Sequence, residues 1–332
     1  MKLIAIDDRN SLPKYKQIVL SVETAIAEKR IIRGDKLPSV NKIALEFSIS
    51  RDTVLLAYEE LKKRGIIYAR AGKGYYVKSE EFSFEQRIFL LFDELNSFKE
   101  DLYNSFMETM DNNAQIDIFF HYFSLPVFRK LINENNGDYS KYIIMPTTLK
   151  GAAEIIKTLP KNDVYILDQT NTELEEYPSV HQNFVKDMYN ALTAAKKKLS
   201  RYRKLILIFP GSKQPPGMAE GFTLFAEQND FPYEIVPDST ITKIEKGNVY
   251  IIPNDRDLVS IIEQTIAAGL IIGKDTGIIS YNDTPLKKVV HNGITTISTD
   301  FKAMGKILAE MILHQKKENI ENVCMLVERK SL

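Results

Sequence analysis

Several features that carry function in other proteins are scarce in this chain of 332 residues. It has one cysteine, Cys324, which excludes an internal disulfide and any cysteine-rich metal site. Its histidines are His121, His181, His291 and His314, and their spacing fits no metal-binding motif. We therefore expect neither a metal nor another cofactor, and we interpret His121 and Cys324 as buried structural residues.

Motifs of nucleophilic and phosphate chemistry are also missing. The sequence contains no G-x-S-x-G elbow and no G-x-x-x-x-G-K-[ST] phosphate loop. Asp93 and Glu94 are adjacent, but neighbouring residues on an extended chain point apart and cannot act as an acid–base pair. We therefore expect a protein that is not an enzyme.

Long hydrophobic runs are absent as well. No apolar stretch approaches the roughly 18 residues that suggest a transmembrane helix. The apolar residues near the N-terminus are followed at once by Asp7, Asp8 and Arg9, which is unlike a secretory signal peptide. We expect a cytoplasmic protein without a membrane partner.

Net charge is zero, with 44 basic and 44 acidic residues, but the charge is distributed unevenly. Residues 1–80 hold 16 Lys and Arg against 10 Asp and Glu, whereas the remainder holds 28 against 34. A basic N-terminal module on an acidic body favours DNA contact at one end of the protein. The length suits two or three domains.

Residues 37–77 have the pattern of two short helices followed by a β-hairpin. Ser39 and Ser50 are candidate N-caps for the two helices, and Gly65 ends the second. Short β runs at 66–69 and 75–77 flank a glycine-rich turn, and another helix is predicted at 13–32. This order predicts a winged helix-turn-helix, an α+β fold.

The second helix of such a unit lies in the DNA major groove, with its N-terminal residues facing the base edges. Arg51 can form a bidentate pair with guanine, and Lys73 at the wing tip can meet phosphate. Backbone N–H groups at both helix starts can also bind phosphate. The residues expected to contact DNA are Ser39, Asn41, Lys42, Ser50, Arg51, Asp52, Thr53, Lys73, Gly74 and Tyr75.

Residues 13–77 resemble the N-terminal domain of the gluconate-repressor (GntR) family of bacterial transcription regulators. The matching stretches are Pro13-Lys14-Tyr15-Lys16-Gln17-Ile18, Gly34-Asp35-Lys36-Leu37-Pro38-Ser39, Ser50-Arg51-Asp52-Thr53-Val54 and Gly72-Lys73-Gly74-Tyr75. The chain departs from the family at Asn41 and Leu55, where an arginine is usual, and Lys42 could replace one of them. The alternative is a winged helix used only for protein contacts.

Beyond residue 87 the pattern alternates between strand and helix. Strands are predicted at 88–92, 116–120, 142–145, 164–167, 205–209, 233–236, 249–252 and 277–281, and helices at 97–110, 125–133, 149–157, 185–199, 218–228, 256–268 and 300–315. Runs that are apolar throughout favour parallel strands covered on both faces, as in a doubly wound α/β fold. Residues 78–87 are polar and are interpreted as a linker.

Polar residues follow several of these strands, where ligands bind in doubly wound folds. They lie in 93–96, 146–148, 168–169, 210–212, 253–255 and 282–283. Taken singly, each could simply cap the next helix. As a set, they favour a ligand-binding cleft.

Residues 88–329 are similar to the effector domain of the lactose-repressor (LacI) family and the related type I periplasmic sugar-binding proteins. The segment 278–313 carries most of this resemblance, and 93–98 and 143–147 add to it. It implies two lobes, 88–170 with 297–316 and 171–296 with 318–329, and a ligand between them. The expected domains are 1–77, the linker 78–87, and a two-lobed periplasmic-binding-protein-like domain at 88–332.

By the same resemblance, the ligand would contact Asn96, Phe98, Asn183, Asn254, Asp255 and Asn282. Carboxylates and amides bind hydroxyls, and an aromatic face packs on a sugar ring. Asn183 and Asn282 stand where aspartates are common in that family, and Met218 where an arginine is usual. A sugar is therefore the expected class of effector, without the usual charged clamp.

These patterns lead to one main hypothesis and one alternative. The main hypothesis is a transcription regulator, a repressor that binds operator DNA as a homodimer and is controlled by a small ligand. The alternative is a winged helix fused to an enzyme-like domain, such as a pyridoxal-phosphate fold, or to a ligand-independent dimerisation domain. The pyridoxal-phosphate fold would need more chain than remains here and a Schiff-base lysine, which the sequence does not show.

Overall fold

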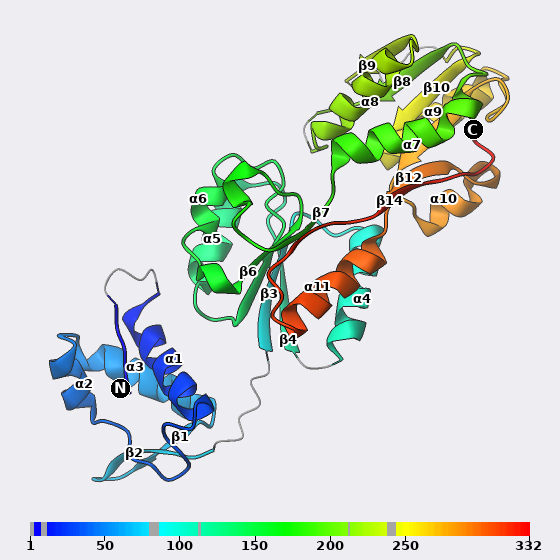
Figure 1. Ribbon diagram of the computed structural model, residues 1–332. Coiled ribbons are helices and arrows are strands. Elements are labelled where there is room, and N and C mark those ends of the chain that lie inside the picture. Colours follow the sequence, from blue (N-terminus) through cyan, green and yellow to red (C-terminus); the bar gives the residue numbers. More distant parts are fainter. Residues whose placement is uncertain (1–2, 8–11, 80–85, 112–113, 212, 238–243) are drawn as a thin grey trace.

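The structure is a computed structural model that describes residues 3–7, 12–79, 86–111, 114–211, 213–237 and 244–332. The chain forms an N-terminal winged helix-turn-helix followed by two α/β lobes (Figure 1). The fold predicted from the sequence is confirmed. The predicted linker, 78–87, lies mostly outside the described residues, and its last two residues already belong to a strand.

The N-terminal domain contains the predicted helices and hairpin. Its elements are α1 (Lys14–Ala27), α2 (Val40–Glu46), α3 (Arg51–Lys63), β1 (Ile67–Arg70) and β2 (Gly74–Val77). The helix α1 ends well before residue 32, because Lys29 adopts a left-handed conformation that no α-helix continues. The core of the N-terminal domain is built around Tyr58, which is fully buried and whose hydroxyl donates a hydrogen bond to Pro38 O at 2.7 Å.

The first lobe is a six-stranded parallel sheet in the order β13-β7-β6-β5-β3-β4. Its strands are β3 (Gln86–Phe92), β4 (Ala114–Phe120), β5 (Lys141–Ile144), β6 (Val164–Asp168), β7 (Ser179–His181) and β13 (Asn319–Glu321). Its helices are α4 (Ser97–Met110), α5 (Leu125–Asn135), α6 (Ala152–Ile156) and α11 (Phe301–Leu313), with 3-10 turns at Lys161–Asp163 and Thr172–Leu174.

The helices α4 and α11 run side by side over one face of this sheet (Figure 1). Gly305 of α11 lies so close to α4 that a side-chain carbon there would collide with Leu102 O. The close approach buries Phe106, Met304 and Leu308 against the sheet. Two helices that are far apart in sequence therefore form one layer of the first lobe.

The second lobe is a six-stranded sheet in the order β14-β12-β11-β10-β8-β9, in which only β14 is antiparallel to its neighbour. Its strands are β8 (Lys204–Ile208), β9 (Tyr233–Val236), β10 (Asn248–Ile252), β11 (Gly277–Tyr281), β12 (Thr295–Thr299) and β14 (Cys324–Val327). Its helices are α7 (Phe184–Leu199), α8 (Gly217–Gln228), α9 (Asp255–Ala267) and α10 (Pro285–Val289), with a 3-10 turn at Val290–Asn292.

The predicted limits of the lobes were partly wrong. The strand β7 was assigned to the second lobe but pairs with β6 of the first, and β13 in turn pairs with β7. Conversely, β12 pairs with β11 of the second lobe. The chain crosses between the lobes three times, after β7, β12 and β13, so neighbours in sequence fall in different lobes.

The N-terminal domain also touches the first lobe. Lys16 of α1 pairs with Asp138 at 2.8 Å and donates to Asn136 O at 2.5 Å. Gly137, between these two partners, has φ of 83°, and a side-chain carbon there would collide with Leu12 and Lys16. The turn after α5 is thus fitted closely to α1.

Candidate functional sites

The start of α3 presents side chains to solvent in a fixed arrangement. Ser50 is the N-cap and accepts from Thr53 N at 3.1 Å, and its hydroxyl lies 2.8 Å from Thr53 Oγ1. Because this cap holds the first turn, the side chains of Arg51 and Asp52 project outward, and both residues are exposed. A cation at this end of an exposed helix can reach the edge of a base pair.

The start of α2 has the same construction. Ser39 is the N-cap and accepts from Lys42 N at 3.2 Å. Asn41 and Lys42, in the first turn, are both exposed. The positive ends of two helix dipoles, each with uncommitted first-turn N–H groups, are therefore open to an anion such as phosphate.

The wing is a tight hairpin in which Arg70 pairs with Gly74 and Lys73 lies exposed at the tip. Tyr75 packs edge-on against Tyr58 with ring centroids 4.7 Å apart, which makes it an anchor of the wing. Arg70 lies 5.3 Å above the ring of Tyr76. Sequence analysis missed Arg70 as a wing cation, although its position beside the glycine-rich turn was a usable signal.

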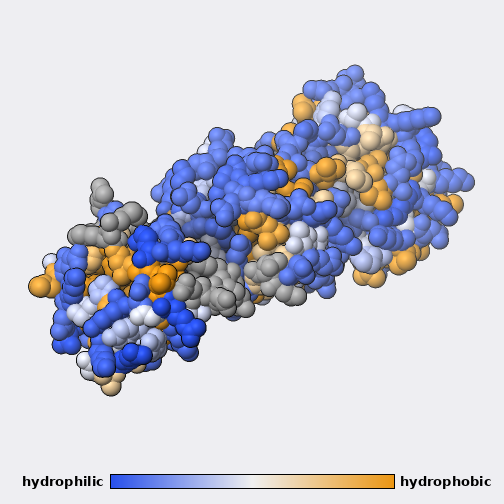
Figure 2. Space-filling model, turned by 60° about the horizontal axis from the view of Figure 1, so that its bottom comes forward, coloured by the Kyte–Doolittle hydropathy of each residue, from blue (hydrophilic) through white to orange (hydrophobic). Residues whose placement is uncertain are grey.

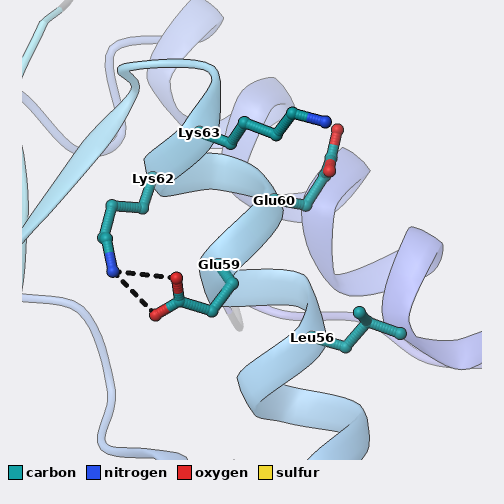
Figure 3. Close-up of a pocket in the computed structure, with 5 residues that line it drawn as sticks. All are labelled: Leu56, Glu59, Glu60, Lys62 and Lys63. Carbon is teal, nitrogen blue, oxygen red and sulfur yellow. Dashed lines mark hydrogen bonds and ion pairs between the residues drawn. The ribbon is translucent and has the colours of Figure 1, made fainter.

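Further along α3 the charged side chains are largely neutralised by each other. Lys62 donates to both carboxylate oxygens of Glu59, at 2.9 and 2.8 Å, and Glu60 pairs with Arg64. Figure 3 shows Glu59, Glu60, Lys62, Lys63 and Leu56 around a hollow on α3, with Leu56 on the same side of the helix as Glu60. These pairs engage Lys62 and Arg64, whereas Arg51 in the first turn of α3, Lys42 on α2 and Lys73 on the wing are exposed.

The two lobes meet at the carboxyl ends of their strands. Lys213, after β8, pairs with Glu94, after β3, at 2.8 Å and lies 4.7 Å from the ring of Phe123. Gln182, where the chain leaves β7, is buried and bonds to both Asp168 and Thr299. Of the polar strand ends that the sequence singled out, Glu94 and Asp168 therefore take part in the contacts at the boundary between the lobes.

Two predicted ligand residues of the second lobe are linked through Lys287. Its Nζ pairs with Asp255 at 2.8 Å and donates to Asn282 O at 3.0 Å. Asn282 adopts a left-handed conformation with φ of 59°, and its side-chain Oδ1 is buried without a partner. A backbone strained at such a position, with an unsatisfied acceptor, is typical of a binding site.

The other predicted ligand residues serve as helix caps or packing groups. Asn96, Asn183 and Asn254 are the N-caps of α4, α7 and α9. Asn183 also donates to Glu321 at 3.1 Å, beside the third crossing between the lobes. Phe98 is half-buried and stacks on Phe301 at 4.7 Å. Among the predicted ligand residues, the structure thus links Asn282 and Asp255 through Lys287. It shows no such link for Asn96, Phe98, Asn183 and Asn254 among the described contacts.

Sequence analysis missed a buried polar cluster in the first lobe. Asp93 forms an ion pair with Lys99, and both side chains are buried. Burial lowers the pKa of Lys99 to about 8, although the nearby carboxylate of Asp168 raises it. Thr147 and Asp168 adopt left-handed conformations, and Thr147 Oγ1 has no partner. Thr147 and Asp168 were recognisable as polar strand ends, but nothing in the sequence singled out Lys99.

Of the two residues interpreted as buried structural residues, His121 is buried, whereas Cys324 is only half-buried. His121 is fully buried, with Nε2 3.1 Å from Met145 O, and burial lowers the pKa of its ring to about 4. The ring is therefore neutral at pH 7. Cys324 lies in β14, and burial raises the pKa of its thiol to about 12, which leaves it a poor nucleophile.

Two known family models match this chain, one in the N-terminal domain and one in the C-terminal part. Residues 14–77 match the family model described as bacterial regulatory proteins, gntR family. Residues 201–332 match the periplasmic binding protein-like domain. None of the helices in the described ranges has the length and the hydrophobicity that crossing a membrane requires.

Relatives of known role match over a short part of their length. The HTH-type transcriptional repressor YtrA of Bacillus subtilis is 39% identical over 75 residues, which is 23% of this chain and 58% of YtrA. The mannosyl-D-glycerate transport/metabolism system repressor MngR of Escherichia coli is 34% identical over 97 residues, which is 29% of this chain and 38% of MngR. The chain thus covers less than two thirds of either relative.

Solved structures match over most of the chain at low identity. A GntR transcription regulator from Chromobacterium violaceum has a TM-score of 0.62 at 13% identity and covers 74% of this chain and 99% of its own. The Lac repressor bound to ONPG has a TM-score of 0.60 at 16% identity and covers 85% and 90%. The chain therefore joins a gntR-family winged helix-turn-helix domain to a periplasmic-binding-protein-like domain with the two-lobed fold of LacI-type regulators.

Proposed function

We propose that this protein is a sequence-specific DNA-binding transcription repressor whose operator affinity is set by a small ligand. The observation that carries the proposal is the exposed first turn of α3, with Arg51 projecting from a capped helix start in a gntR-family domain. Ser39, Asn41 and Lys42 on α2 and Lys73 on the wing supply the contacts to phosphate. The protein works in the cytoplasm and catalyses no reaction.

The ligand is a polyhydroxylated molecule, a sugar or a sugar derivative, bound where the lobes meet. Three residues with left-handed backbone support this placement, because Asp168 ends β6, and Thr147 and Asn282 follow the carboxyl ends of β5 and β11. The unpartnered oxygens of Asn282 and Thr147 can each bond to a hydroxyl of the ligand. MngR, whose name refers to a mannosyl compound, gives the sugar class additional support.

The repressor acts as a homodimer on a near-palindromic site. One winged helix covers too few base pairs for high specificity. The second lobe has an exposed apolar surface formed by α9 and α10. The ion pair between Lys287 of α10 and Asp255 of α9 holds these two helices together. The most exposed members of this surface are Leu286 at 72% and Val289 at 71%. In the view of Figure 2, hydrophobic side chains lie in several separate groups on the surface of the protein.

The ligand changes DNA binding by changing the angle between the lobes. The first lobe holds α1 through Asp138 and Asn136, so its movement carries the N-terminal domain with it. In a dimer, a shift of a few ångströms between the two α3 helices removes the contacts of one half-site. The expected coupling is about 1–3 kcal/mol, or several-fold to roughly a hundredfold in affinity.

Selection of bound duplexes from a random DNA pool tests the first part of the proposal. We expect the chain to enrich a pair of inverted half-sites, and light scattering to show a dimer at micromolar concentration. A thermal-shift screen with a sugar panel then identifies the ligand class. If no duplex is enriched at physiological salt, the DNA-binding proposal is wrong, and if no sugar or sugar derivative raises the melting temperature, the ligand class is wrong.

A further inference from the structure

The recognition helix α3 carries two adjacent leucines on the side away from the protein core. Leu56 is 54% exposed, and Leu55 is half-buried. Within the described part of the N-terminal domain, neither is among the residues that form or pack against its core. Single exposed leucines are common on protein surfaces, but two in succession at this place require an explanation.

Helical spacing places these leucines directly after the polar first turn. Residues four apart lie on one face of a helix, so Leu55 follows Arg51 and Leu56 follows Asp52. The opposite face of α3 is buried through Val54, Ala57, Tyr58 and Leu61. The exposed face thus has a charged first turn and an apolar second turn.

The third turn offers little to a base edge. Its carboxylate, Glu59, is engaged by Lys62 through two hydrogen bonds, as Figure 3 shows. Sequence readout after Arg51 therefore falls to Leu55 and Leu56. Neither side chain has a hydrogen-bonding group, so both can contribute only apolar contact.

Given the DNA-binding function proposed above, on which this inference rests, we propose that Leu55 and Leu56 read thymine methyl groups. The C5-methyl of thymine is the apolar feature that a base presents in the major groove. The other bases have no methyl group on their major-groove edge, so the leucines would lose this apolar contact there. The operator half-site therefore has thymines beside the guanine that Arg51 pairs with.

The test compares thymine with deoxyuridine, which differs only by the missing methyl group. A selected operator is prepared with deoxyuridine at one thymine position at a time, and affinities are measured by fluorescence anisotropy at fixed salt. For the wild-type chain we expect about a fourfold loss per contacted methyl, the equivalent of about 0.8 kcal/mol for one buried carbon. The affected positions should lie beside the guanine.

Alanine variants assign the lost contacts to residues. In Leu55→Ala and Leu56→Ala, the affected positions should lose their sensitivity to deoxyuridine. Leu20→Ala is the matched control, because Leu20 is 52% exposed on α1 of the same domain and should leave the sensitivity intact.

Two results would overturn the inference while leaving the DNA-binding proposal in place. One is wild-type protein that binds every deoxyuridine operator as tightly as the thymine operator. The other is the same methyl sensitivity in both alanine variants as in the wild type. The comparison of thymine with deoxyuridine operators uses wild-type protein, so it tests the inference even if a variant folds poorly. A chain that enriches no duplex at all would instead overturn the proposed function.

Discussion

At the scale of single residues, the exposed polar groups of the N-terminal domain differ in what they can recognise. Arg51 projects from the first turn of α3, whereas Lys73 lies at the tip of the wing. A guanidinium can pair with two acceptors of one guanine, but an ammonium on a flexible stem acts as a point charge toward phosphate. The two residues should therefore differ in their effect on specificity.

We predict that Arg51→Ala costs about 1–3 kcal/mol of operator binding and relaxes base preference. Lys73→Ala should weaken binding to all sequences alike and lower the slope of log affinity against log salt by about 1. Anisotropy titrations on operator and random DNA at several salt concentrations measure both effects. Unchanged operator affinity in Arg51→Ala at physiological salt would contradict the assignment of α3 as the recognition helix.

Asn282 gives a second residue-scale prediction. Its buried and unpartnered oxygen should bond to the ligand, so replacing the amide should abolish the ligand response and leave ligand-free DNA binding intact. Asn282→Gly is preferable to alanine, because φ of 59° suits glycine without strain. Asn292→Gly is the matched control, since Asn292 is exposed with φ of 62°. A normal ligand response in Asn282→Gly would count against the site.

Asp187 gives a prediction about pH. Burial raises the pKa of its carboxyl to about 7, and Oδ2 has no partner. The folded state therefore binds a proton that the unfolded chain releases near pH 4, so this group destabilises the fold as pH rises from about 4 to 7. Asp187→Asn should raise the free energy of unfolding at pH 8 by about 2–4 kcal/mol and leave it nearly unchanged at pH 4.

Urea titrations at the two pH values measure this difference. Lys197→Gln, a change at an exposed position on the same helix α7, serves as the control. Equal stability of wild type and Asp187→Asn at pH 8 would show that the carboxyl is not held in its protonated form.

At the scale of elements, the first lobe depends on the close approach of α4 and α11. The two helices come from opposite ends of the effector domain, and Gly305 allows their backbones to touch. The same contact positions Phe98 against Phe301 and holds the start of α4 at the boundary between the lobes. The packing of these helices therefore supports the candidate ligand site.

We predict that Gly305→Ala lowers the free energy of unfolding by about 1–3 kcal/mol through overpacking. The added carbon would collide with Leu102 O, which is backbone and cannot turn away. Lys302→Ala, on the exposed side of α11, should change stability little. Denaturant titration of the two variants decides the point, and a Gly305→Ala variant as stable as wild type would contradict the observed helix spacing.

At the scale of the whole molecule, the contact between α1 and the turn after α5 connects the N-terminal domain to the first lobe. The lobes in turn are joined by Lys213 and Glu94, and by Gln182 at the first crossing. A ligand that closes the lobes acts on all these contacts together. The mechanism proposed above therefore couples DNA binding to ligand binding through the first lobe.

We predict that Gly137→Ala reduces the effect of ligand on operator affinity toward none. The added carbon would collide with the side chains of Leu12 and Lys16 and displace Lys16 from its pair with Asp138, which weakens the contact between α1 and the first lobe. Gly151→Ala is the matched control, because Gly151 has nearly the same φ, 84° against 83°, and a side-chain carbon there would meet only Leu125 Cδ2 at 3.9 Å, an ordinary contact. Operator titrations with and without ligand measure the coupling, and an unaltered ligand effect in Gly137→Ala would exclude this route.

The sequence by itself determined the features that depend on neighbouring residues. Ser39 and Ser50 cap their helices as predicted, because an N-cap needs only a side chain and the next turn of backbone. The buried strands of both lobes were recognisable from continuous apolar runs. Strands β7, β12, β13 and β14 were missed as separate elements, because they are short or rich in polar residues.

Only the tertiary structure decided which lobe each returning segment joins and which polar groups meet. The strand β13 lies beside β7, which is about 140 residues earlier in the chain. The pairs Asp93–Lys99 and Glu94–Lys213 join groups whose partners no local pattern specifies. Such contacts follow from the packing of the whole sheet and from the cost of burying a charge without a partner, and neither can be read from spacing along the chain.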